Sequence, residues 1–582
     1  MSDSYRPIMK RVSILILLVS VAALFWFSFR LAGIRIYQVD ECQNVFTARI
    51  LATGQSGNSF TGITLFLLPL VWLGRNITTS VELFVAARFF SFELFWLNIV
   101  LLALATGEKL FSRRGLVALI GAATLAPLWD YGFEIRHDNL LLSGLLLMWC
   151  VVRVRPEGLQ SYFIAGALAV GLEFVAFKAF VYVVPIALAV LIFPPPGYRA
   201  PRWKLALAWI AGAVGAFLLV RIAYGMAGLW DVYLGGVRTL LQNASGGIRF
   251  APWDTLSRLL TQDPLLLVFV TSGLIAMACD LRRRGRAALI WDGNLPEALL
   301  FAVALAALLI NPAPYPYDLL HLVPYAFLFA FRYASALVNS ISDRPALVPV
   351  IGAVVIFTHL LPFGIATRRH LKMSNYHQEG LMCLAESLTD PVKDPVYDGV
   401  GMVPTRRSIH YQWFLHSLNI RNFVAGPGLR VRDMLAARPA AVIIPNYRTD
   451  WLPEEDHDFI RGHYVPLADD FWVLGKVLSP GGGTFAIGHA GRYRISSLQG
   501  SDIMGTFPAG LQGLTTPEND GNLEGTLDGK PLSAGVVELT VGEHRIATAT
   551  DCQPAVVWMG PRVDRIHRMS QSDHRLLFFN WY

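Results

Sequence analysis

The sequence predicts a polytopic α-helical membrane protein with about 11 transmembrane helices, followed by an extracytoplasmic region of α/β and then β-sandwich-like structure. Of the 582 residues, 54% are hydrophobic and only 16% are charged, whereas soluble domains carry about 25% charged residues. The charges are also uneven, because residues 1–363 carry a net charge of +9 and residues 364–582 a net charge of −2. These observations exclude a water-soluble enzyme, a disordered chain and a coiled coil.

Apolar stretches long enough to cross a bilayer, about 20 residues each, recur through the first part of the chain. We place them near 12–33, 81–106, 115–132, 137–153, 160–178, 181–193, 205–224, 264–280, 295–311, 319–338 and 346–364. The first has a basic flank but no small-residue cleavage site, so we interpret it as a span and not as a signal peptide. The stretch 61–74 is too short to span, and we interpret it as re-entrant or interfacial.

Basic residues in the short loops predict the orientation. With a cytoplasmic N-terminus, the cytoplasmic loops contain Lys109, Arg113, Arg114, Arg153, Arg155, Arg199, Arg202, Lys204, Arg282, Arg283, Arg284, Arg286 and Arg344. This pattern follows the positive-inside rule. We therefore expect a multi-pass protein of the cell inner (cytoplasmic) membrane with its C-terminal region on the periplasmic, extracytoplasmic face. The basic residues punctuate apolar runs, so the net charge of +7 does not indicate nucleic acid.

Three domains are expected, with boundaries at 1–365, 366–480 and 481–582. In the second, strand patterns at 396–403 and 440–447 and a helical pattern at 410–419 indicate an α/β domain.

The third domain shows alternation typical of β-strands, for example Tyr493 and Ile495 between arginines. Asp528-Gly529 fits a hairpin turn. Tyr493 and Trp558 are candidates for exposed aromatic side chains that grip glycan, with a purely structural lid as the alternative. Cys383 and Cys552 could pair in an oxidising compartment.

A first acidic pair, Asp40 and Glu41, directly follows the first span and precedes a predicted helix that contains Val45, Ala48 and Leu51. Two adjacent carboxylates at a membrane rim can serve as general base or metal ligand. The alternative is a pair of acids that only caps the helix.

A second cluster lies at 129–139, where Glu134, Arg136, His137 and Asp138 fall within five positions before a span. Arginine can hold a phosphate while a carboxylate remains for an acceptor or a metal. The alternative is a solvated loop. Under the predicted topology both acidic clusters lie on the same face of the membrane.

Further candidates share that face. Lys178 is a lone cation between two apolar runs and could meet an anionic head group, or it could snorkel to the interface. The loop at 311–325 contributes Tyr317, Asp318 and His321. His321 could bind a metal or phosphate, although a lone histidine is more often structural.

Nucleotide-binding motifs are absent, because the sequence has neither GxxxxGK[ST] nor a GxGxxG after a buried strand. A lipid-linked donor reached from within the bilayer therefore suits the architecture better than a nucleotide-activated one.

Several segments in order along about residues 10–340 resemble the GT-C glycosyltransferases, in the branch of the dolichyl-phosphate-mannose protein mannosyltransferases and the bacterial aminoarabinose transferase. The matching segments are DE at 40–41 with the helix after it, VAARFFS at 85–91, EKLFSRRGLVALIGAATLA at 108–126, EIRHDNLLL at 134–142, GLEFVAFKAFVYVVP at 171–185 and YPYDLLHLVPYAFL at 315–328. The small residue and tyrosine that often follow the first acidic pair are replaced by Cys42, Gln43 and Asn44.

This resemblance implies transfer of a sugar from a polyprenyl-phosphate-linked donor to a glycan, lipid or protein acceptor at the outer face, with inversion. Asp40 would be the general base with Glu41 beside it, and Asp138 would belong to the second acidic motif. The donor phosphate would be bound by Arg136, Lys178, His321 and Tyr317. No cofactor is certain, and a divalent metal ion with Glu41, His137 and Asp138 as candidate ligands remains open.

Two other classes of protein compete with a transferase. A multi-span transporter should show paired halves with broken helices at mid-membrane, and no such halves are visible in the sequence. A non-catalytic cell-envelope scaffold would account for the C-terminal region but would leave both acidic loops unexplained.

Overall fold

The structure is a computed structural model that describes most of the chain. The described residues are 6–54, 65–154, 158–192, 201–243, 251–284, 295–311, 314–342, 348–410, 413–415, 430–468, 470–498, 523–532, 535–549, 551–561 and 577–578. They form two compact units. Unit 1 contains residues 1–35, 61–68 and 87–374, and unit 2 contains residues 36–60, 69–86 and 375–582.

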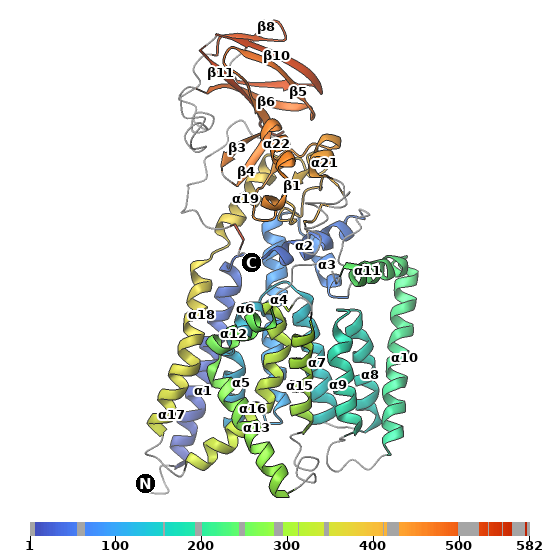
Figure 1. The fold of residues 1–582 in the computed structure, drawn as a ribbon, viewed down its shortest axis with the longest axis vertical. Helices are drawn as coiled ribbons and strands as arrows, with labels where there is room; N and C mark the ends of the chain where they lie inside the picture. Colours follow the sequence, from blue (N-terminus) through green and yellow to red (C-terminus); the bar gives the residue numbers. More distant parts are fainter. Residues whose placement is uncertain are drawn as a thin grey trace. The chain divides into compact units, whose positions relative to one another are not determined.

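Unit 1 is built from helices (Figure 1). They are α1 (Arg6–Ile34), α5 (Arg113–Ala123), α6 (Ala126–Tyr131), α7 (His137–Trp149), α8 (Leu159–Glu173), α9 (Ala179–Ile192), α10 (Arg202–Met226), α11 (Trp230–Asn243), α12 (Pro252–Gln262), α13 (Pro264–Arg284), α15 (Leu295–Ile310), α16 (Leu319–Ser342), α17 (Val348–Val355) and α18 (Leu361–Lys372). The helix α4 (Ser80–Ala105) begins in unit 2 and continues through unit 1.

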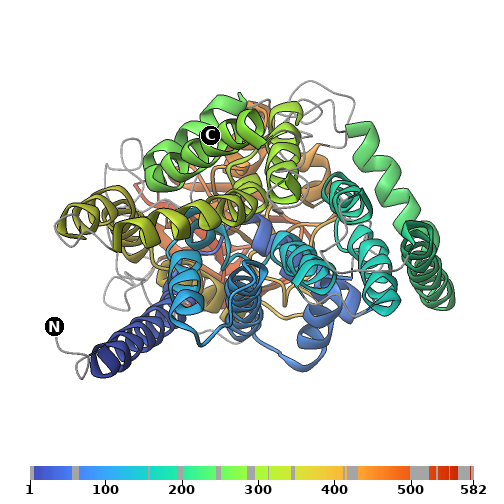
Figure 2. The same cartoon turned by 90° about the horizontal axis from the view of Figure 1, so that it is seen from below.

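Four helices of the described chain are long and apolar enough to cross a membrane by length and composition, at Arg11–Ile34, Ser80–Ala105, Arg202–Met226 and Pro264–Arg283. Shorter apolar helices add to them, and Figure 2 shows the helices of unit 1 from below. The prediction of a polytopic helical membrane protein with a C-terminal sheet region is therefore confirmed. The number of spans stays a prediction.

Small residues allow α8 and α10 to pack closely. A Cβ atom on Gly166 would lie 1.9 Å from the carbonyl oxygen of Trp209, and one on Gly212 would lie 1.9 Å from that of Phe163. Only glycine fits such backbone contacts, which are common between membrane helices because their association depends on close packing.

Two predicted spans differ from the observed helices. The apolar stretch 115–132 is divided between α5 and α6, because Pro127 in the first turn of α6 starts a new helix after Thr124. The last predicted span, 346–364, extends as α17, a π-helical turn (Ile356–Leu360) and α18 as far as Lys372.

The short stretch 61–74 lies partly outside the described residues. Its described part contributes to α3 (Leu67–Asn76), whose 10 residues are too few to span a bilayer. Of the basic loop residues, Arg155, Arg199, Arg286 and Arg344 also lie outside the described residues.

Unit 2 combines helices with two sheets. The helices are α2 (Val39–Ala52), α19 (Tyr376–Ser387), α21 (Val431–Ala437) and α22 (Glu454–His463). The strands are β1 (Val396–Tyr397), β2 (Val442–Ile443), β3 (Tyr464–Ala468), β4 (Phe471–Val477), β5 (Gly482–Ile487), β6 (Gly491–Leu498), β7 (Gly525–Leu527), β8 (Lys530–Pro531), β9 (Gly535–Leu539), β10 (Gly542–Thr548) and β11 (Gln553–Trp558).

A seven-stranded sheet has the order β1-β2-β4-β11-β6-β9, with β3 also paired to β4, and a four-stranded sheet has the order β5-β10-β7-β8. The pair β1 and β2 is parallel, and β4 pairs antiparallel with β11. The larger sheet thus joins strands on both sides of residue 480, so the predicted boundary there does not separate two sheets.

Several local predictions in this unit are tested directly. Asp528 and Gly529 both have positive φ and connect β7 to β8, so the hairpin turn is confirmed. Tyr493 and Trp558 are buried, 0% and 3% exposed, and their expected exposure to glycan was wrong. The two rings pack against each other instead, with centroids 5.3 Å apart.

Cys383 is exposed and Cys552 is half-buried, and their pairing stays a prediction. The predicted strands at 396–403 and 440–447 are present as the short strands β1 and β2. The predicted helix at 410–419 lies outside the described residues except at 410 and 413–415.

Candidate active site

The site of unit 1 is built around the start of α7. Arg136 has extended backbone angles at the N-cap of this helix, and Asp138 lies in its first turn. The carboxylate of Asp138 is fully buried. Its Oδ2 lies 3.0 Å from Nε of Arg136, and its Oδ1 lies 2.6 Å from Nζ of Lys178. Two cations from separate segments therefore converge on one buried carboxylate.

Lys178 lies just before α9 and contacts a second acid. Its Nζ is 3.0 Å from Oδ1 of Asp318, which ends the short 3₁₀ helix before α16. The other oxygen of Asp318 accepts hydrogen bonds from Nδ2 of Asn311 at 3.0 Å and from the backbone N–H of Tyr315 at 3.1 Å. Lys178 is thus shared between two carboxylates from different loops.

An aromatic side chain lies against both cations. The guanidinium carbon of Arg136 is 3.7 Å from the ring centroid of Tyr317, and Nζ of Lys178 is 5.4 Å from it. Such distances allow cation–π attraction. Tyr315 stacks on Tyr317 with centroids 5.1 Å apart. The predicted phosphate-binding residues Arg136, Lys178 and Tyr317 are therefore brought together.

His321 lies one turn after Asp318 on α16 and is fully buried. Its ring stacks on that of Tyr182, with centroids 4.9 Å apart. Neither ring nitrogen has a hydrogen-bond partner among the described residues. Because unsatisfied buried polar groups are costly and rare, such a ring is a candidate contact for a ligand.

The predicted metal ligands do not form a metal site among the described residues, where no group of three His, Cys, Asp or Glu side chains could hold an ion. His137 is partly exposed, and its Nε2 lies 3.9 Å from Asp138. Both oxygens of Asp138 already face cations, which would repel a divalent ion. The metal expectation stays a prediction.

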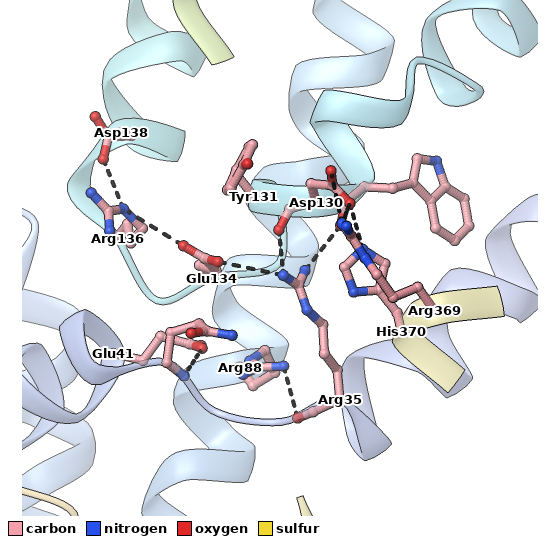
Figure 3. A network of polar contacts seen from close by, with 12 residues as sticks. Arg35, Glu41, Arg88, Asp130, Tyr131, Glu134, Arg136, Asp138, Arg369 and His370 are labelled. Carbon is pink, nitrogen blue, oxygen red and sulfur yellow. Dashed lines mark hydrogen bonds and ion pairs between the residues drawn. The ribbon is translucent and has the colours of Figure 1, made fainter. Parts of the chain in front are cut away.

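A buried ion network extends from the site through Glu134 (Figure 3). Oε2 of Glu134 lies 3.8 Å from Nε of Arg136, and Oε1 lies 3.4 Å from the guanidinium of Arg35. Arg35 also donates hydrogen bonds to the backbone oxygens of Trp129, at 2.9 Å, and Asp130. The side chains of Arg35 and Glu134 are only 1% and 3% exposed.

The Asp130 carboxylate anchors a second part of this network. It contacts Nε2 of His370 at 2.6 Å and a guanidinium nitrogen of Arg369 at 3.3 Å, both on α18. It also accepts a hydrogen bond from Nε2 of Gln262 at 2.7 Å. Asp130 thus connects α6, α12 and α18 inside unit 1.

Sequence reasoning missed Arg35, Asp130 and His370 as parts of this network. Asp130 stands inside the acidic segment 129–139 but was not singled out there. An ionisable residue beside apolar spans is costly and asks for a partner, which is the signal that could have identified Asp130. The choice of partner could not be read from the sequence, because His370 is 240 positions away.

The first acidic pair belongs to unit 2 and to α2, which begins at Val39 and so includes both acids. Glu41 is fully buried, and one of its oxygens accepts a hydrogen bond from the backbone N–H of Gln38 at 2.8 Å. This contact completes a capping box, so Glu41 has a structural role. Asp40 is half-buried. Its proximity to Asp138 stays a prediction.

The fold and the buried ion cluster define a multi-span helical membrane protein with an appended sheet unit and a candidate anion-binding site. No family model and no curated protein matches the sequence.

Two solved structures are similar to this one. The structure of ArnT from Cupriavidus metallidurans bound to undecaprenyl phosphate shares 12% identity over 79% of this chain and 97% of that chain, with a TM-score of 0.47. The structure of the Archaeoglobus fulgidus oligosaccharyltransferase in complex with Zn and sulfate shares 12% identity over 78% of this chain and 73% of that chain, with a TM-score of 0.44. Both TM-scores are below 0.5, so neither likeness assigns a function to this chain.

Proposed function

We propose that the chain is a GT-C glycosyltransferase that moves a sugar from a polyprenyl-phosphate carrier to an acceptor hydroxyl at the outer face of the cytoplasmic membrane. The observation that carries the proposal is the convergence of Arg136 and Lys178, from separate loops, on Asp138 and the ring of Tyr317. A buried arginine and a half-buried lysine that lie between acids and an aromatic ring suit a phosphate bound at a membrane rim. The order of motifs along the sequence supports the same class of enzyme.

The cations would bind the donor phosphate. An arginine can hold two phosphate oxygens at once, and a lysine acts as a point charge. Both would also offset the charge that develops on the phosphate as its bond to the sugar breaks. His321 would add a polar contact, since its ring nitrogens have no partner among the described residues.

The reaction would be a single displacement. The acceptor hydroxyl oxygen forms a bond to the anomeric carbon while the bond from that carbon to the phosphate oxygen breaks. Asp40 takes the hydroxyl proton, and the polyprenyl phosphate leaves with the electron pair. One displacement inverts the configuration at the anomeric carbon. Asp138 would orient the two cations beside the departing phosphate.

The test compares substitutions at the two acids in membranes that carry normal amounts of the protein. We expect Asp40→Asn to lower transfer by about 100-fold or more, which is the usual contribution of a general base. Asp138→Asn should also lower transfer, because both cations lose their shared carboxylate. Transfer is measured as the sugar added to the cell-surface glycan, with mass spectrometry to identify the product.

Two further variants sharpen this test. Glu41→Gln should retain transfer, since glutamine can also serve in a capping box. Glu108→Gln is the control for an acid-to-amide change, because Glu108 forms only a partly exposed pair with Arg114 at 3.7 Å. Unchanged glycan in both aspartate variants, at normal protein abundance, would reject the proposed function.

A further inference from the structure

Glu134 and Asp318 share one arrangement at the two cations of the ion cluster. In each carboxylate one oxygen faces a cation of the proposed phosphate site, and the other oxygen is held by a second group, which is Arg35 for Glu134 and a pair of groups in its own loop for Asp318. Glu134 faces Arg136 at 3.8 Å and Arg35 at 3.4 Å. Asp318 faces Lys178 at 3.0 Å through one oxygen and Asn311 at 3.0 Å through the other.

Arg35, the second cation that contacts Glu134, is itself held in place. Arg35 is 1% exposed and donates hydrogen bonds to the backbone oxygens of Trp129 and Asp130. The backbone oxygen of Glu134 also accepts a hydrogen bond from Nδ2 of Asn139 at 2.9 Å. Glu134 is therefore held in place from both its backbone and its side chain, and Arg136 meets a carboxylate with little freedom to move.

The carboxylate of Asp318 is held in place by a backbone hydrogen bond. The N–H of Tyr315 donates to Asp318 at 3.1 Å and closes the turn that places Tyr317. The same turn therefore orients the carboxylate that contacts Lys178 and the ring that lies against Arg136.

On the basis of the proposed function, we propose that Glu134 and Asp318 are positioning residues that hold Arg136 and Lys178 in the orientation that binds the donor phosphate. Without these carboxylates, each cation would turn toward Asp138, the one acid that both already contact. A rigid supporting group matters because a displacement of about 1 Å at a binding group can lower function by about 100-fold.

Binding of radiolabelled undecaprenyl phosphate to the full-length protein in lipid nanodiscs tests this proposal. We expect Glu134→Gln and Asp318→Asn each to weaken binding by about tenfold to 100-fold. Glu108→Gln and Asp280→Asn, on segments away from the cluster, are the matched controls and should bind as the wild type does. Thermal unfolding midpoints of all variants establish that the protein remains folded.

Double variants separate positioning from a general structural role. If Glu134 acts through Arg136, then Glu134→Gln adds no further loss of binding in an Arg136→Ala background. The same holds for Asp318→Asn in a Lys178→Ala background. Losses that add fully in both backgrounds would overturn the positioning role, as would normal binding by both single variants. If one single variant fails to fold, the other cycle tests the same claim on the other cation.

The outcomes also distinguish this inference from the proposed function. A wild-type protein that does not bind undecaprenyl phosphate would overturn the proposed function itself. Wild-type binding that is lost in Arg136→Ala and Lys178→Ala but is normal in Glu134→Gln and Asp318→Asn would leave the proposed function standing and reject only the positioning role.

Discussion

At the scale of single residues, Lys178 illustrates how a charge is accommodated beside an apolar helix. Removing an ion from water costs several kcal/mol, and the half-buried Lys178 contacts two carboxylates, Asp138 and Asp318. Arg136 is likewise placed between Glu134 and Asp138. Pairing of this kind makes the charges tolerable, and it also sets the direction in which each cation points.

The ion pair of His377 and Asp470 in unit 2 predicts that the stability of the folded protein depends on pH. The hydrogen bond from His377 to Asp470 raises the pKa of the histidine above its ordinary value of about 6.5. Because the folded-state pKa is the higher one, the stabilisation is fully present below about pH 6.5 and is lost as the pH rises through the raised pKa.

We therefore expect the unfolding midpoint of the full-length protein to fall as the pH rises from about 6.5 through the raised pKa of His377. The fall should correspond to less than about 1 kcal/mol of unfolding free energy. Asp470→Asn should remove this part of the pH dependence. Identical pH profiles of the wild type and this variant, measured by thermal unfolding, would show that the pair contributes nothing.

At the scale of elements, the last helix of unit 1 is fastened by its C-terminal turn. Arg369 and His370 on α18 both contact Asp130 on α6, and Gln262 at the end of α12 contacts it as well. A second histidine, His359 in the π-helical turn, lies 3.2 Å from Asp263. These polar contacts fix the position of α18 against α6 and α12 more specifically than apolar packing alone would.

Substitution of Asp130 should loosen this attachment. We expect Asp130→Ala to lower the free energy of unfolding by about 3 kcal/mol, because the buried His370 and the side chain of Gln262 both lose the carboxylate that they contact. Glu108→Gln, with its partly exposed partner, should change it by less than about 1 kcal/mol. Denaturant unfolding or protease sensitivity of α18 measures the difference, and equal values would contradict the role given to Asp130.

Hydropathy and local patterns predicted much at this scale. Apolar runs located most helices of unit 1, and alternation located β6. The pattern could not say which side of β6 is covered. Tyr493 was expected to be exposed, but it packs under Trp558 and donates a hydrogen bond to the backbone oxygen of His489 at 2.6 Å. The broken span at 115–132 could have been foreseen from Pro127.

Local sequence patterns identified some residues of the candidate site but not the contacts between distant segments. Arg136, Asp138 and Lys178 were recognised because each is an ionisable residue beside an apolar run, where charges are rare. Arg35 and Asp130 carry the same signal, but their contacts depend on how distant helices pack, and no local pattern encodes that packing.

At the scale of the whole molecule, unit 2 gathers segments from three regions of the chain. Residues 36–60 and 69–86 join residues 375–582. Within this unit the backbone N–H of Ser80 donates a hydrogen bond to the carboxylate of Glu386 at 2.7 Å, and its hydroxyl lies 2.9 Å from that of Thr405. Phe46 packs on Trp413 with centroids 4.3 Å apart. The predicted domain boundary between residues 365 and 366 divides the chain in sequence order. Local sequence patterns could not predict that segments before residue 87 would pack with the C-terminal region.

The continuity of the larger sheet predicts the effect of truncation. A chain that ends at Pro480 loses β6 and β11. β4 keeps β2 and β3, but its last residues, Gly475–Val477, lose their partners on β11. Strand residues without a partner expose their backbone groups and promote aggregation. We expect the remaining part of unit 2 to be degraded faster in limited proteolysis than in the full-length protein, whereas an independent domain at 366–480 would be digested at the same rate in both.

The string of alternating charges in unit 1 has a consequence for how such a sequence can vary. Arg35, Glu134, Arg136, Asp138, Lys178 and Asp318 form one unbroken path of neighbours with opposite signs. Loss of an inner member removes one ion pair from each of two neighbours at once, while loss of an end member removes one ion pair from a single neighbour. Among naturally occurring relatives, changes should therefore enter from the ends of the path and in matched pairs, and its interior should be the slowest to diverge.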